Sequence, residues 1–119
     1  MIRTKRVYEK ANKDDGFRVL VDRLWPRGLT KEKAAADLWL KEIAPSDVLR
    51  KNFHTEKVTW AEFAKKYRAE LANKTESLAQ IRGLEKKHGT VTLLYGRNDE
   101  TQNQAVVIAE ALKGERRPR

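Results

Sequence analysis

Two apolar runs interrupt a chain that is otherwise polar and charged. The first spans residues 17–25 and contains Val19-Leu20-Val21, which predicts a strand buried on both faces because successive side chains of a strand point to opposite sides of the sheet. Pro26 cannot donate a ladder hydrogen bond, so we expect this strand to end near residue 25. The second run, residues 90–96, has the same character and predicts a second buried strand.

Two weaker patterns predict further strands. Residues 2–8 alternate loosely around Val7 and Tyr8 and predict a first strand. The linker after it ends in the turn signal Asp14-Asp15-Gly16 and is too short for a full crossover helix, so parallel and antiparallel pairing both stay open for this strand. Residues 38–43 predict a third strand that ends at Ala44-Pro45-Ser46, where the proline stops the ladder.

Helical patterns separate these strands. Thr59-Trp60-Ala61-Glu62 matches a capping box, and the apolar residues that follow it recur at helical spacing, which predicts a core-facing helix. We expect four more helices: a short one from the cap Thr30 through Ala36; one capped by Ser46, with Val48, Leu49 and Phe53 facing inward; one from the cap Thr75 to Gly89; and one from Asn103 to Lys113, ended by Gly114. Strands that alternate with helices predict an α/β fold, a single layered domain with a small, mainly parallel sheet flanked by helices.

Length and composition narrow the protein class. The 119 residues suit one domain, which we expect over residues 1–113, followed by a basic C-terminal tail at residues 114–119. The chain has no cysteine, which excludes disulfides and cysteine nucleophiles and favours a cytoplasmic location. The longest apolar run, residues 105–109, is too short to cross a bilayer, and no targeting segment is expected.

No metal or cofactor is predicted. His54 and His88 lie far apart in the sequence and fit no metal-ligand spacing. Neither a Walker P-loop nor a GxGxxG motif is present, so nucleotide cofactors lack their usual signature. Ser46 and Ser77 lie at or near predicted helix starts, where capping explains them better than catalysis.

Residues that could hold an anion follow both buried strands. The net charge of +9 makes an anionic partner plausible. Ligands bind at the carboxyl edge of open parallel sheets, and there the two strands would bring together two sets of side chains. The candidate ligand-binding residues are Arg23, Trp25, Arg27, Gly96, Arg97 and Asn103, and the candidate catalytic residues are Asp22, as a base or as an orienting partner of an arginine, and Tyr95, as a hydrogen-bond donor.

Two geometric questions stay open at this edge. Alternation along the strand places Asp22 and Arg23 on opposite faces, so both can serve one pocket only if the backbone bends. Trp25 and Trp39 could be stacking surfaces for a ligand, although aromatic residues on strands usually pack in the core. Asp22 could also simply pair with an arginine and finish the strand end.

Several segments resemble a known family. The runs Arg18 to Gly28, Trp39 to Ser46, Trp60 to Phe63 and Thr92 to Tyr95 closely resemble those of the bacterial YeaO-like proteins, domain-of-unknown-function family 488. The resemblance covers nearly the whole chain and implies an α/β fold, but no established activity. Longer members of the wider family carry a cysteine where Tyr95 stands and Cys-His-Arg where Asn103-Gln104-Ala105 stands, so thiol or histidine chemistry cannot be carried over to this sequence.

Three functions remain as hypotheses. The first is an α/β protein, an enzyme or a binding protein, that holds a small anionic or phosphorylated ligand at the carboxyl edge of its sheet. The second, ranked lower, is a nucleic-acid-binding or regulatory module with a diffuse basic surface, because no recognised nucleic-acid-binding motif is present. The third is a protein-interaction subunit. Substrate, reaction and oligomeric state are not specified by the sequence.

Overall fold

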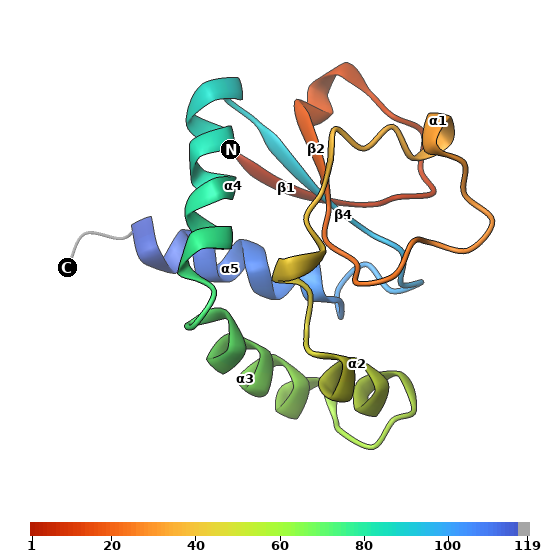
Figure 1. Ribbon diagram of the computed structural model, residues 1–119, viewed down its shortest axis with the longest axis vertical. Helices are drawn as coiled ribbons and strands as arrows, with labels where there is room; N and C mark the ends of the chain where they lie inside the picture. Colours follow the sequence, from red (N-terminus) through yellow and green to blue (C-terminus); the bar gives the residue numbers. More distant parts are fainter. Residues whose placement is uncertain (117–119) are drawn as a thin grey trace.

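The computed structural model describes residues 1–116 and has one parallel sheet of four strands (Figure 1). The strands are β1 (Ile2–Arg6), β2 (Phe17–Leu20), β3 (Leu38–Trp39) and β4 (Val91–Tyr95), in the order β1-β4-β2-β3. All neighbouring strands run parallel, so the open orientation of the first strand is resolved as parallel to β4. The predicted α/β fold is confirmed.

β2 and β3 end earlier than the sequence predicts. β2 stops at Leu20, where the Leu20 carbonyl accepts a hydrogen bond from Leu40 N–H (2.9 Å), and only Val21 still donates to β4, to the Leu94 carbonyl (3.0 Å). The chain then bends at Arg23 and Leu24. Extension of this strand to residue 25 was therefore wrong, and so was extension of β3 beyond Trp39, because residues 41–43 form a 3-10 turn.

Five helices complete the fold, and most of their predicted ends are confirmed. They are α1 (Lys31–Ala34), α2 (Asp47–His54), α3 (Trp60–Leu71), α4 (Thr75–His88) and α5 (Gln104–Arg116). Ser46 and Thr59 cap α2 and α3, and Gly89 ends α4 with a positive φ of 83°. α1 stops two residues early because Ala35 is left-handed, and Thr75 is the first helical residue of α4 rather than its cap.

The end of α5 differs from the prediction. Gly114 does not end the helix, which continues to Arg116. The remainder of the expected basic tail, residues 117–119, lies outside the described residues.

Each face of the sheet buries its own cluster of side chains. On one face Val19, Leu93 and Tyr95 join a core that includes residues of α3, α4 and α5. On the other face Leu20 and Leu94 pack with residues of the segment that contains α1. The inward side of α2 consists of Leu49 and Phe53 but not Val48, which is 71% exposed, contrary to the prediction.

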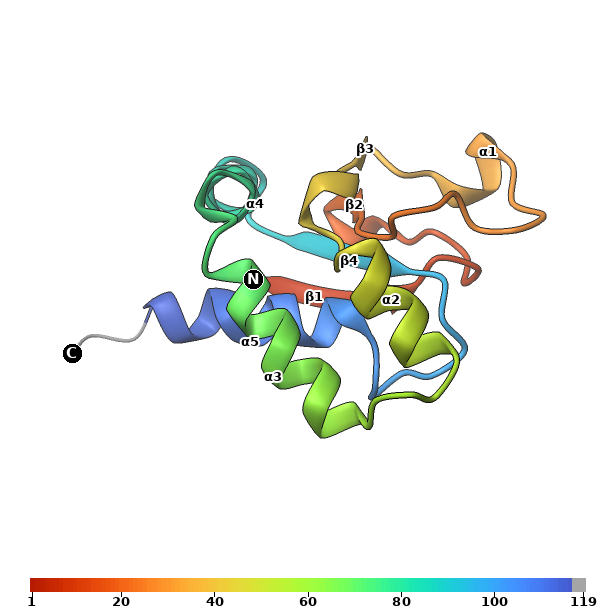
Figure 2. The ribbon, with the colours of Figure 1, turned by 60° about the horizontal axis from the view of Figure 1, so that its bottom comes forward.

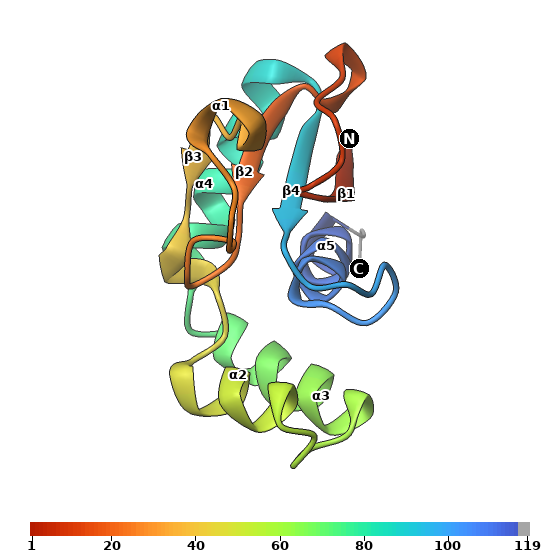
Figure 3. The same ribbon diagram turned by 90° about the vertical axis from the view of Figure 1, so that its right-hand side faces the viewer.

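A pair of packed helices, α2 and α3, lies beside the carboxyl edge of the sheet. α3 packs against both α5 and α2, so the α2–α3 pair extends from the helical layer (Figure 2). Figure 3 shows that β2 and β4 point toward the end of the molecule where this pair lies. Within residues 1–116, no helix is long and apolar enough to cross a membrane.

Candidate ligand-binding site

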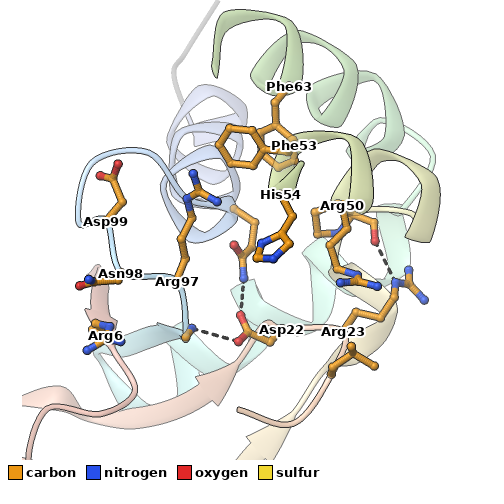
Figure 4. Close-up of a pocket in the computed structure, with 14 residues that line it drawn as sticks. Arg6, Asp22, Arg23, Arg50, Phe53, His54, Phe63, Arg97, Asn98 and Asp99 are labelled. Atoms are coloured by element: carbon orange, nitrogen blue, oxygen red, sulfur yellow. Dashed lines mark hydrogen bonds between the residues drawn. The ribbon is translucent and has the colours of Figure 1, made fainter. Parts of the chain in front are cut away.

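A cavity of about 550 Å³ lies at the carboxyl edge of the sheet (Figure 4). Its walls come from the end of β1, the bend after β2, helix α2, the loop after β4 and the first residue of α5. The side chains include four arginines, Arg6, Arg23, Arg50 and Arg97, and two aspartates, Asp22 and Asp99. The cavity wall is therefore cationic.

Asp22 lies between the arginines, with Arg6 and Arg97 on one side and Arg23 and Arg50 on the other (Figure 4). Its Oδ2 accepts a hydrogen bond from Gly96 N–H (2.9 Å), and its Oδ1 accepts one from the Gln104 side-chain amide. Burial raises the pKa of the Asp22 carboxyl to about 6, against the lowering effect of these two hydrogen bonds. The bend after β2 thus places a carboxyl group that changes charge near pH 6 at the centre of the cavity wall.

Position 96 requires a glycine because its backbone lies very close to the Asp22 carboxylate. A Cβ atom at this position would lie 2.7 Å from Asp22 Oδ2, which is shorter than any normal contact. The absence of a side chain lets the backbone N–H reach the carboxylate. The backbone N–H of Gly96, nominated from the sequence as a ligand-binding residue, thus bonds a side chain of the protein itself.

Arg23 fixes one wall of the cavity. Its Nε donates to the Pro45 carbonyl (2.9 Å) and its Nη2 to the Ala44 carbonyl (3.4 Å). Lys74 Nζ donates to the same Ala44 carbonyl (2.6 Å), so two cations hold the connection that leads into α2. Asp22 and Arg23 both line the cavity, because the backbone bend removes the strand alternation that would have separated them.

The other three arginines have unused donors. The Nε atoms of Arg6, Arg50 and Arg97 are buried and have no hydrogen-bond partner within residues 1–116. Arg50 forms an ion pair with Asp47 (2.7 Å), whereas neither Arg6 nor Arg97 has a carboxylate within ion-pair distance in the described part of the chain. Their guanidinium groups instead lie over aromatic rings, Arg6 over Tyr8 (4.5 Å) and Arg97 over Phe53 (4.1 Å).

In the loop after β4, the carboxylate of Asp99 is hydrogen-bonded by backbone groups of the same loop. The Asp99 carboxylate accepts hydrogen bonds from the backbone N–H groups of Gln102 and Thr101 (both 3.0 Å), and these lower its pKa. The carbonyl of Asp99 accepts a hydrogen bond from the side chain of Asn103 (2.8 Å). These contacts stabilise the loop that carries Arg97.

Four of the residues nominated from the sequence lie outside the cavity lining. Arg27 is exposed in the loop before α1, where its carbonyl accepts a hydrogen bond from Tyr8 Oη (2.7 Å). Trp25 packs edge-on against Trp39 (5.4 Å) and donates to the Leu29 carbonyl (2.6 Å), so it is a packing residue. Neither Trp25 nor Arg27 therefore contributes to the cavity wall.

Tyr95 and Asn103 are buried in the folded structure and do not line the cavity. Tyr95 is 2% exposed in the core, and burial raises the pKa of its phenol. Asn103 is fully buried and caps α5, since its Oδ1 accepts from Val106 N–H (3.2 Å). The structure therefore does not bring the proposed catalytic pair, Asp22 and Tyr95, into one cavity.

Comparison with known proteins places the chain in a family. A family model described as "Inactive DUF488-N3 subclade" matches residues 1–118. The chain belongs to this subclade. It is 48% identical over 112 residues to "Uncharacterized protein YeaO" of Escherichia coli (strain K12), an alignment that covers 94% of this chain and 96% of the relative.

More distant relatives of this subclade member occur in mycobacteria. "Uncharacterized protein Rv3073c" of Mycobacterium tuberculosis (strain ATCC 25618 / H37Rv) is 38% identical over 113 residues, which cover 95% of this chain and 94% of the relative. "Uncharacterized protein Mb3100c" of Mycobacterium bovis has the same identity and coverage. No solved structure matches.

In this subclade member, sequence reasoning missed Arg6, Arg50, Phe53, His54 and Gln104 as cavity residues. Arg6 follows from the carboxyl-edge rule once β1 is known to be parallel. Arg50, Phe53 and His54 have the spacing of one helix face, and that signal was present in the sequence. Nothing local in the sequence indicates that Gln104 bonds Asp22 across 82 residues.

The cavity also lacks several groups common in enzymes. Among the residues that the structure describes, no serine, threonine, tyrosine or lysine lines it, and the sequence has no cysteine. Residues 1–116 contain no group of three or more histidines and carboxylates that could hold a metal ion.

Proposed function

We propose that this protein binds a small anionic molecule, one that carries a phosphate, sulfate or carboxylate group, in the cavity at the carboxyl edge of its sheet. The observation that supports this proposal is the set of three arginines, Arg6, Arg50 and Arg97, whose buried Nε atoms have no partner within residues 1–116. A buried donor without a partner is costly, and a bound anion would remove that cost.

The charge of the cavity wall favours the same class of ligand. Four arginines face two aspartates, and one of these acids, Asp99, is already hydrogen-bonded within its own loop. Arginine forms bidentate, charge-assisted hydrogen bonds with oxyanions. In this proposal Arg6 and Arg97 hold the anion directly, Arg50 adds charge while paired with Asp47, and Arg23 and Gly96 position the wall.

Binding without turnover is the form of the proposal that the comparisons favour. The description of the subclade as inactive fits a cavity without a hydroxyl or thiol nucleophile. Acid–base catalysis by Asp22 is the second candidate, because its pKa of about 6 suits a group that exchanges protons near neutral pH. That candidate predicts conversion of the bound ligand, which would be lost in Asp22→Asn.

The nucleic-acid hypothesis predicts that a different set of arginines contacts the ligand. A diffuse basic surface uses exposed cations more or less equally, whereas a cavity depends on those that line it. Arg97 lines the cavity and Arg27 is exposed outside it, so the two residues separate the hypotheses.

The test is thermal stabilisation of the wild type, Arg97→Ala and the charge-matched control Arg27→Ala by phosphate, sulfate, sugar phosphates, nucleotides and short RNA at constant ionic strength. We expect small anions to raise the melting temperature of the wild type and of Arg27→Ala, but not of Arg97→Ala. Stabilisation by RNA alone, reduced equally by both substitutions and abolished by salt, would support the diffuse surface. Absence of stabilisation by every small anion would refute the proposal.

A further inference from the structure

The cavity combines its cations with an aromatic wall. Phe53 stacks on Phe63 with ring centroids 4.2 Å apart and an angle of 19° between the ring planes. The guanidinium carbon of Arg97 lies over the same Phe53 ring, 4.1 Å from its centroid. Figure 4 shows this group of three side chains on one side of the cavity, above Asp22.

The cavity is also larger than a simple anion needs. A volume of about 550 Å³ lies within the usual range of cavities for drug-sized ligands. Leu24 and Pro45 add apolar surface to the wall. Phosphate or sulfate alone would leave this apolar part unused.

From this arrangement we infer that the ligand carries a flat aromatic or heteroaromatic ring in addition to its anionic group. The inference rests on the proposed function. The ring packs against the Arg97–Phe53 pair, while the anionic group accepts hydrogen bonds from the arginines. Stacking on an aromatic side chain and on an arginine plane is a sequence-independent source of affinity for rings of this kind.

Arg97 serves both parts of such a ligand. Its guanidinium is planar and lies on an aromatic ring, which allows a second ring to stack on it, and its Nε is an unused donor. Lysine at this position would keep the positive charge but lose the plane. Arg97→Lys therefore affects both ring and anion recognition, whereas Phe53→Leu removes an aromatic ring of the wall and leaves every arginine in place.

The experiment compares the affinities of probes that have the same charge with and without a ring, by calorimetry at constant pH and ionic strength. The pairs are phenyl phosphate with methyl phosphate, and adenosine and uridine monophosphates with ribose 5-phosphate. We expect the ring to tighten binding by at least about tenfold in the wild type. In Phe53→Leu the gain should fall below about threefold, while the affinity for methyl phosphate stays within about threefold of the wild type. In Arg97→Lys the affinity for both probes should fall, and the gain from the ring should also fall below about threefold. Two variants are compared because a single substitution can weaken binding by disturbing the fold rather than by removing ring recognition.

The outcomes separate this inference from the proposed function. Equal affinities for phenyl and methyl phosphate would overturn the ring inference and leave anion binding intact. Binding of neither probe would overturn both. A ring gain confined to the nucleotides would assign the ring to a nucleobase, and a gain with both pairs would assign the site to aryl anions in general.

Discussion

Replacement of Asp22 by asparagine should stabilise the protein at neutral pH, an unusual expectation for a hydrogen-bonded residue. Asparagine has the same shape as the acid. Its oxygen can accept the Gly96 hydrogen bond, and the Gln104 amide can turn over to accept from the new NH₂ group. Asp22→Asn thus keeps both contacts and removes only the ionisation.

The magnitude follows from the difference between the native and the unfolded pKa of this carboxyl. The native value is about 6 and the ordinary value is 3.8, chiefly because of burial. Each pKa unit corresponds to about 1.4 kcal/mol. The ionised carboxylate therefore costs the native state about 3 kcal/mol above pH 6, which corresponds to roughly 10 °C in melting temperature for a domain of this size.

The sign of the pH dependence is fixed by linkage. Between pH 3.8 and 6 the native protein binds more protons at Asp22 than the unfolded chain does, so this group lowers the stability as the pH rises through that window. The free energy of unfolding, measured by urea titration at pH 4 and pH 8, should differ little between the wild type and Asp22→Asn at pH 4. At pH 8 the variant should be more stable by about 1–3 kcal/mol.

Asp99→Asn is the control of opposite sign. Hydrogen bonds from Gln102 and Thr101 lower the pKa of Asp99, so its ionised form stabilises the native state above the unfolded pKa. This variant should lose stability at pH 8 and lose little at low pH. If the difference between wild type and Asp22→Asn did not change between pH 4 and pH 8, the assignment of a costly ionisation to Asp22 would be refuted.

Three further predictions concern the same framework. Gly96→Ala should cost about 1–3 kcal/mol in urea unfolding, because the new Cβ displaces the Asp22 carboxylate from the Gly96 N–H, whereas Gly83→Ala in α4, with open space around it, should gain up to about 1 kcal/mol. Arg18→Met should cost about 3–5 kcal/mol in the same assay, because it breaks the buried ion pair with Asp15; an unchanged midpoint would contradict this. Sulfate, whose charge is constant in this range, should bind roughly threefold to tenfold more weakly at pH 7.5 than at pH 5 by calorimetry, since Asp22 ionises in between. His54 also lines the cavity, so His54→Gln is the control, and a pH dependence that survives in Asp22→Asn would refute this cause.

The sequence predicted the layered fold because its strongest signals are local. The apolar runs of β2 and β4 and the caps of α2 and α3 need no tertiary information. The direction of β1 stayed open because the linker after it is too short for a full crossover helix, and only its pairing with β4 shows that it runs parallel. No local pattern indicates the bend at Arg23 and Leu24, which follows the end of β2 at Leu20.

A cavity lies at the edge of the sheet where the sequence predicts a site, but only part of the nominated residues line it. Asp22, Arg23, Gly96 and Arg97 line the cavity because the rule for parallel sheets places strand ends together. Arg27 was nominated on sequence proximity alone, and it lies outside the cavity lining. The contribution of α2 was missed because its position depends on the contacts of Arg23 and Lys74 with the chain that precedes it.

The contacts of Asp22 explain why a destabilising acid can persist at this position. Gly96 offers a backbone N–H at the one distance that a side chain would forbid, and Gln104 supplies a second donor, so both oxygens are satisfied without a cation. Arg23, the adjacent cation, is committed to backbone carbonyls instead. If an arginine paired with Asp22, the cavity would lose both charges together. Because Asp22 is satisfied by neutral donors, Arg6 and Arg97 have no carboxylate within ion-pair distance in the described structure, which is the arrangement that an anionic ligand requires.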